Sequence, residues 1–245
     1  MVKETEIGGP GGAGFPDTPW TAILAKARER GGLDPSVLDR IARLYWRPVY
    51  FWFRYRWNRP PDDAKDLTQE LFTRLINPES VVALDPQRGR LRLYLKASAD
   101  NLARQVARDA GRLKRGGGRR LADLDQVDEA RFQAPEDDAA CERLYDAEWA
   151  KALVERSMEL LEERLRQARK ERYVELLRFH DLAKGETPSY QDAAERFGLT
   201  LDQVRNHLRY ARGLLREIVR EHLKQSLADP TDVDGEYEHL FGSSG

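Results

Sequence analysis

Residues 188–216 read PSYQDAAERFGLTLDQVRNHLRYARGLLR and hold the most informative local pattern in the chain. Ser189 with Asp192, and Thr200 with Gln203, form two helix-capping pairs, each with its second member three residues after the cap. Gly198 lies between the two predicted helices, because glycine adopts the left-handed conformation that ends a helix without a Cβ clash. The stretch therefore predicts two short helices around a tight glycine turn.

The second helix of this pair has an apolar face and a polar face. Apolar residues recur at helical spacing and predict a buried stripe: Val204, Leu208, Ala211 and Leu215. Basic and amide side chains lie outside that stripe: Arg205, Asn206, Arg209 and Arg212. This is the pattern of a helix-turn-helix, which reads DNA with its second helix. Structural helix pairs share the pattern, so the case for DNA binding depends on the rest of the chain.

Composition excludes several classes of protein. The 245 residues include 41 Lys+Arg and 42 Asp+Glu, for a net charge of −1, so a nucleic-acid surface requires segregated charge. One cysteine, Cys141, rules out an intrachain disulfide framework, and the four histidines lack metal-ligand spacing. We therefore expect no metal and no cofactor. No apolar run reaches membrane-spanning length and the sequence shows no signal-peptide pattern, so we expect a soluble, cytoplasmic protein.

The charge is in fact segregated into two neighbouring stretches. Residues 86–120 hold eleven Lys/Arg against two acids, and residues 121–148 hold ten Asp/Glu against two Arg. At helical spacing the basic residues fall near one side, which is an electrostatic footprint for phosphates: Lys96, Arg104, Arg108, Arg112 and Arg115. The acidic stretch has few large apolar residues and predicts a linker.

A third pattern is the amphipathic stretch DDAKDLTQELFTRLI at residues 62–76. Asp63, Asp66 and Glu70 line one exposed ridge, opposite a predicted buried face made of Leu67, Leu71, Phe72, Leu75 and Ile76. Acids near a helix N-terminus also occur for structural reasons, because the helix dipole favours them. The aromatic-rich segment just before it, residues 45–57, could stack on bases, but we assign it to core packing.

Residues 63–72, DAKDLTQELF, closely resemble the D-A-x-D-L-T-Q-E-x-F signature of bacterial RNA polymerase sigma factors of the extracytoplasmic-function (ECF) type. Residues 45–50 resemble the family's first conserved helix, and residues 91–95 with 101–103 resemble its promoter-opening helix. The helix-turn-helix resembles the second domain, which reads the upstream promoter element. The resemblance covers about residues 35–120 and 150–220. Gln105 departs from a usual acid, and His207 and Tyr210 stand where the family usually has arginine.

The resemblance implies an all-α fold of two helical domains joined by an acidic linker. The expected parts are a flexible N-terminal tail (1–14), a polymerase-binding and promoter-opening domain (15–120), the linker (121–148), a helix-turn-helix domain (149–222) and a C-terminal tail (223–245). The family also implies that the linker threads a basic channel of the polymerase. The tail's apolar cluster at Tyr237, Leu240 and Phe241 either docks on the domain or presents a partner motif.

The implied function is that of a transcription initiation factor, not an enzyme, that binds core RNA polymerase and opens promoter DNA. The implied polymerase-binding residues are Asp63, Asp66, Gln69 and Glu70. The implied DNA-binding residues are Arg92, Lys96, Asn101, Arg104, Arg108, Arg112, Arg115, Arg205, Asn206, Arg209 and Arg212. An inhibitory anti-sigma-type protein is a further expected partner. Two alternatives stay open, a sigma-like adaptor or decoy and an acid-dependent nuclease that holds Mg²⁺.

Overall fold

The structure is a computed structural model that describes residues 26–27, 29–30, 34–75, 90–110, 135, 137–183, 185–227 and 229–242. The regular elements in these ranges are all helical, which confirms the all-α prediction. They are α2 (Pro35–Phe51), the π-helix η1 (Trp52–Arg56), α3 (Pro61–Arg74), α5 (Leu91–Ala110), α6 (Asp138–Gln167), α7 (Glu171–Asp181), α8 (Tyr190–Phe197), α9 (Leu201–Ser226), the short 3-10 helix η4 (Pro230–Asp232) and α10 (Val233–Phe241). The predicted N-terminal tail at 1–14 and the linker residues 121–134 lie outside the described residues.

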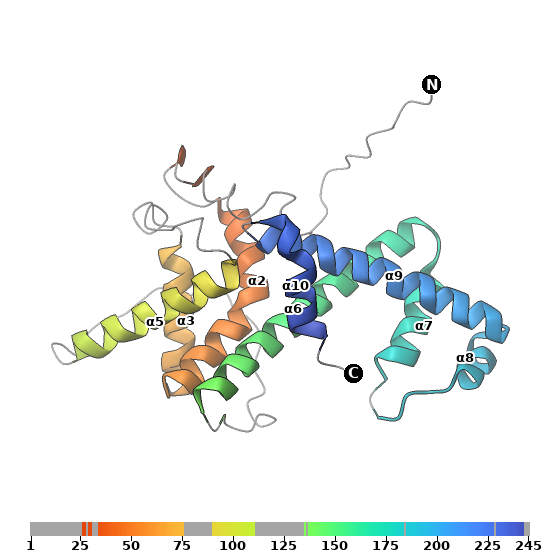
Figure 1. The fold of residues 1–245 in the computed structure, drawn as a ribbon, viewed down its shortest axis with the longest axis horizontal. Helices are drawn as coiled ribbons and strands as arrows, with labels where there is room; N and C mark the ends of the chain where they lie inside the picture. Colours follow the sequence, from red (N-terminus) through yellow and green to blue (C-terminus); the bar gives the residue numbers. More distant parts are fainter. Residues whose placement is uncertain are drawn as a thin grey trace.

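The helices form two groups along the long axis of the molecule (Figure 1). Helices α2, α3 and α5 form one end, and α7 and α8 form the other. The two long helices α6 and α9 run between the ends, and α10 lies near the middle. Elements from distant parts of the sequence therefore meet at the centre of the molecule.

An aromatic core holds the first group together. Five aromatic side chains of α2 and η1 are buried: Tyr45, Tyr50, Phe51, Trp52 and Phe53. The other aromatics of the 45–57 segment pack partly buried against the same core. The prediction that these side chains serve core packing is confirmed. Large aromatic rings supply much of the buried apolar area in a small helical core.

Helix α2 begins at a side-chain cap and ends by widening into the π-helix η1. The Asp34 carboxylate accepts a hydrogen bond from the Ser36 backbone N–H at 2.9 Å, and Pro35 occupies the first turn. A proline in a helix interior often kinks or splits the helix, but Pro48 lies inside α2, which continues unsplit to Phe51. Pro48 itself is buried in the aromatic core. Packing of the flanking rings offsets the loss of one backbone donor, and the helix widens into η1 only after Phe51.

Helix α6 begins earlier than predicted. We expected a linker up to residue 148, but α6 starts at Asp138 behind an Asp137 cap whose side chain accepts from Ala140 N at 2.6 Å. Cys141, Tyr145 and Trp149 recur at four-residue spacing and are buried in the first core. We predicted a linker here because acids are frequent around these residues, although their spacing is helical. Residues 138–148 are therefore part of the folded core.

A second, smaller core unites α7, α8 and parts of α6 and α9 around Leu161, Leu176 and Val204. The predicted turn chemistry is confirmed. Both capping boxes are formed, at Ser189 with Asp192 and at Thr200 with Gln203, and Gly198 has a φ of 62°.

The C-terminal segment is folded against the rest of the molecule. Tyr237, Leu240 and Phe241 of α10 pack partly buried against the first core. Of the two outcomes considered for this cluster, docking is the one observed. A single antiparallel bridge between Arg90 and Leu227 also joins the start of α5 to the end of α9.

Candidate polymerase and nucleic-acid interfaces

The acidic ridge on α3 is exposed, as its spacing predicts. Asp63, Asp66 and Glu70 are all exposed, and Gln69 is half-buried beside them. The opposite face is buried at Leu67, Leu71, Phe72 and Leu75, while Ile76 lies outside the described residues. Pro61 at the first turn and the acids that follow it suit a helix N-terminus. A partner with a basic surface could meet this ridge without any change in α3.

The negative charge of Glu70, at one end of the ridge, is already paired within the protein. Arg74 donates from Nε to Glu70 Oε1 at 2.7 Å and from Nη1 to Gln105 Oε1 on α5 at 2.8 Å. Gln105, which departs from the acid usual in the family, thus links the two helices. Asp63 and Asp66 carry the remaining negative charge of the ridge.

The outer face of α5 presents basic and amide groups over two turns. Asn101, Arg104 and Arg108 are exposed. Arg104 lies 3.8 Å from the Asp100 carboxylate and over the Trp57 ring, 5.8 Å from its centroid. Lys96 is half-buried, paired with Glu142 at 3.2 Å and placed over the Trp52 ring at 5.3 Å. Arg112 and Arg115, assigned to the same face, lie outside the described residues.

A partly buried set of hydrogen bonds to Asp100 holds this face in place. The indole N–H groups of Trp52 and Trp57 both donate to Asp100 Oδ1, each at 2.8 Å. A carboxylate that accepts two indole donors fixes both rings against α5, and each ring carries a cation above it. The sequence analysis missed Asp100, because nothing local marks it as the partner of two tryptophans more than forty residues away.

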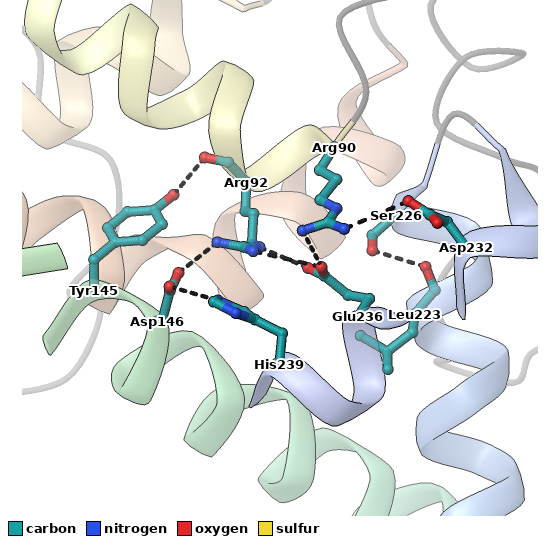
Figure 2. Close-up of polar contacts among 9 residues, drawn as sticks. All are labelled: Arg90, Arg92, Tyr145, Asp146, Leu223, Ser226, Asp232, Glu236 and His239. Atoms are coloured by element: carbon teal, nitrogen blue, oxygen red, sulfur yellow. Dashed lines mark hydrogen bonds and ion pairs between the residues drawn. The ribbon is translucent and has the colours of Figure 1, made fainter. Parts of the chain in front are cut away.

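Arg92 is a correction to the predicted DNA-binding set. Its side chain is only 4% exposed, so it is not on the surface in this structure. Its guanidinium donates to Asp146 Oδ1 and to Glu236 Oε1, both at 2.6 Å (Figure 2). Burial disfavours the charged form, but the hydrogen bond with Glu236 and the charges of Asp146 and Glu236 outweigh it and raise the pKa of Arg92. No local pattern in the sequence indicates that an acid from the C-terminal tail reaches this arginine.

The second helix of the helix-turn-helix presents the predicted outer face. Val204, Leu208 and Ala211 are fully buried, and Leu215 is partly buried. On the other side Arg205, Asn206 and Arg209 are exposed. Within the helix, Arg205 pairs with Asp202 at 3.3 Å and Arg209 donates to Asn206. These bonds between exposed groups are weak enough to exchange for base contacts.

Arg212 has a different environment from the other three polar residues. Its guanidinium donates to both oxygens of Asp181 at the end of α7, at 2.6 and 2.7 Å. Partial burial would raise the pKa of Asp181, but the bonds from Arg212 and His180 lower it. Arg212 therefore fixes α9 to α7, so the structure gives it a positioning role in the free protein.

An aromatic and basic cluster, unpredicted from the sequence, borders the start of α9. Tyr173 of α7 stacks on His207 at 4.0 Å between ring centroids, and Lys170 lies 4.2 Å from the centre of the Tyr210 ring. Burial and the nearby Lys170 charge lower the pKa of His207. His207 and Tyr210, which stand where the family usually has two arginines, thus contact Tyr173 and Lys170. Tyr173 and Lys170 were missed because they lie outside the helix-turn-helix.

Two further searches of the described residues concern other kinds of site. No group of three or more His, Cys, Asp or Glu side chains there could hold a metal ion. No helix in the same ranges is both long enough and apolar enough to cross a membrane.

The chain matches the family model described as ECF sigma factor over residues 57–221. Since that match covers more than half of the chain, the protein belongs to the ECF sigma factor family. Members of this family are non-enzymatic transcription initiation factors that bind core RNA polymerase and promoter DNA. A comparison with curated proteins found no match, and neither did a comparison with solved structures.

Proposed function

We propose that this protein directs core RNA polymerase to a specific set of promoters and helps to open them. In this proposal the α3 ridge meets a basic surface of the polymerase through Asp63, Asp66, Gln69 and Glu70. The outer face of α5 then contacts opened DNA, and the start of α9 reads the upstream promoter element.

The observation that supports the proposal best is the helix-turn-helix. Both of its capping boxes are formed, and Arg205, Asn206 and Arg209 are exposed opposite a fully buried stripe. A recognition helix needs this combination, because the buried face fixes its angle in the groove while exposed donors meet base edges.

The separation of positive charge on α5 from negative charge on α3 supports the same assignment of surfaces to DNA and polymerase. Arg104 and Arg108 are exposed on α5, while Asp63 and Asp66 are exposed on α3. One molecule thus presents a negative surface for a basic protein partner and a positive surface for phosphates.

A selection experiment tests the proposal. Genomic DNA fragments are incubated with core polymerase alone or with core polymerase and this protein, and retained fragments are sequenced. We expect a shared upstream motif only when the protein is present. Identical fragment pools in the two samples would contradict promoter-directed binding.

A further inference from the structure

The buried Arg92 raises the question of what the C-terminal helix does there. Glu236 of α10 is fully buried, and its carboxylate receives two arginines from the start of α5 (Figure 2). Arg92 Nε lies 2.6 Å from Oε1, and Arg90 Nη1 lies 2.6 Å from Oε2. Arg90 also reaches Asp232, just before α10, at 3.4 Å. Acids of the tail therefore pair with both arginines, Arg90 and Arg92, at the beginning of the helix that is predicted to open DNA.

Two other helices join this contact. Asp146 of α6 pairs with Arg92 at 2.6 Å and with His239 of α10 at 3.1 Å. Tyr145 donates from its hydroxyl to the Arg92 backbone carbonyl at 3.0 Å. On the other side of α10, Asp234 pairs with Arg220 of α9 at 2.9 Å. Helix α10 thus connects α5, α6 and α9 through charged groups, in addition to its apolar contacts with the first core.

The tail carries the negative charge that is needed to compete with DNA phosphates for these arginines. Residues 229–241 contain five acids and one histidine, and no lysine or arginine. Three of those acids pair with arginines: Asp232 and Glu236 with Arg90, Glu236 with Arg92, and Asp234 with Arg220. Arg92 is also held by Asp146 of α6. Carboxylates and backbone phosphates make the same charge-assisted bonds with guanidinium groups.

Two other features of α10 weaken its attachment to the rest of the protein. It has nine residues and Gly235 in its interior, so its intrinsic helical stability is low. A partly open pocket of about 160 Å³ lies beside Tyr237 and Phe241, so part of the apolar side of α10 faces solvent. A segment that depends on ion pairs and packs incompletely is suited to release by a competing polyanion.

We propose that α10 with the preceding Asp232 is an autoinhibitory clasp, in which Glu236 withholds Arg90 and Arg92 from nucleic acid until α10 leaves. The clasp rests on the proposed function, since it assumes that the start of α5 meets DNA. It predicts that DNA binding and α10 docking exclude each other.

The first test compares DNA affinity in full-length proteins. The probe is a fluorescently labelled random-sequence duplex of about 30 base pairs, titrated at one fixed salt concentration. Glu236→Gln keeps the shape of the side chain and removes its charge, and we expect it to bind the duplex about tenfold more tightly. Glu238→Gln is the matched control, because Glu238 is exposed on the same helix, and its affinity should equal that of the wild type. Equal or weaker binding by a folded Glu236→Gln protein would overturn the clasp.

The second test needs no variant and so does not depend on the folding of Glu236→Gln. Hydrogen exchange of residues 233–241 is measured in the wild type, free and saturated with the same duplex. We expect protected amides in the free protein and fast exchange in the complex. Unchanged protection in the complex would contradict the clasp while leaving DNA binding intact. If none of the three proteins binds DNA, the DNA-binding part of the proposed function fails, and the clasp fails with it.

Discussion

Arg209 is the side chain of α9 best suited to read a guanine. It is exposed, its fork geometry matches the two acceptors on that base, and it donates to Asn206 on the same outer face. Arg209→Ala should cost about 1–3 kcal/mol of binding free energy and relax base preference at one position. A selection on randomised upstream DNA checks this, with Arg166→Ala on α6 as the control, because Arg166 is also exposed. Identical base preferences for wild type and Arg209→Ala would show that this helix does not read sequence there.

His222 gives the protein a pH-dependent stability. It lies buried between α9 and α6, with Nδ1 3.0 Å from Ser157 Oγ. Burial and the charges of Arg156 and Arg164 lower its pKa from 6.5 to about 4. Between those two values the unfolded chain binds more protons than the folded one, so the free energy of unfolding falls as the pH falls.

The loss should total at most about 3 kcal/mol and should be complete near pH 4. Urea unfolding at a series of pH values measures it, with His222→Gln as the comparison. We expect the slope between pH 6.5 and 4 to flatten in this variant. An unchanged slope would assign the effect to other groups.

At the scale of single elements, the helix-turn-helix contains two glycines, Gly198 and Gly213. Replacing each by alanine should change the free energy of unfolding in opposite directions. Gly198 has a φ of 62°, and a Cβ added there meets nothing within 4 Å, so Gly198→Ala introduces only backbone strain. We expect it to lower the free energy of unfolding by about 1–2 kcal/mol. Gly213 is inside α9 and equally open, so Gly213→Ala should raise that free energy by about 0.5–1 kcal/mol. Chemical unfolding of both variants checks the signs, and a neutral Gly198→Ala would contradict the turn geometry.

Helix α3 carries the expected contact with polymerase. Changing Asp66 and Glu70 together to lysine reverses the charge of an exposed ridge and should cost little stability. We expect this double variant to lose binding to core polymerase in a pull-down assay. The double change Asp39→Lys and Glu171→Lys alters the net charge equally at exposed positions on α2 and α7 and should bind normally. Normal binding by the ridge variant would remove the assigned role of α3.

The elements differ in how far the sequence predicts them, for a physical reason. The two capping boxes, the Gly198 turn and the buried stripe of α9 depend on neighbours three to seven residues away, so they could be predicted. The start of α6 could not, because its acids suggested a solvated linker and only the spacing of Cys141, Tyr145 and Trp149 indicated a helix.

At the scale of the whole molecule, α6 and α9 contribute side chains to both cores. Leu153 of α6 and Leu223 of α9 belong to the first core, and Leu161 and Ile218 belong to the second. The two groups of helices are therefore physically continuous in this conformation. Helix α10 also lies at this central junction.

Long-range charge pairing explains what the sequence could not show about the candidate interfaces. Arg92 and Glu236 are 144 residues apart, and Trp52 and Asp100 are 48 apart. The resemblance to the family assigned Arg92 to DNA binding but could not reveal that the fold buries it against the tail. The exposed sets on α3 and α9 were predictable, because amphipathic spacing alone decides which side of a helix faces solvent.

Transcription in a purified system measures promoter-directed initiation most directly. The components are core RNA polymerase, this protein and the genomic fragments retained in the selection, with core polymerase alone as the control. We expect transcripts with defined start points at a fixed distance from the shared upstream motif, and only when the protein is present. Stable binding to core polymerase without any protein-dependent transcript would contradict the proposed function.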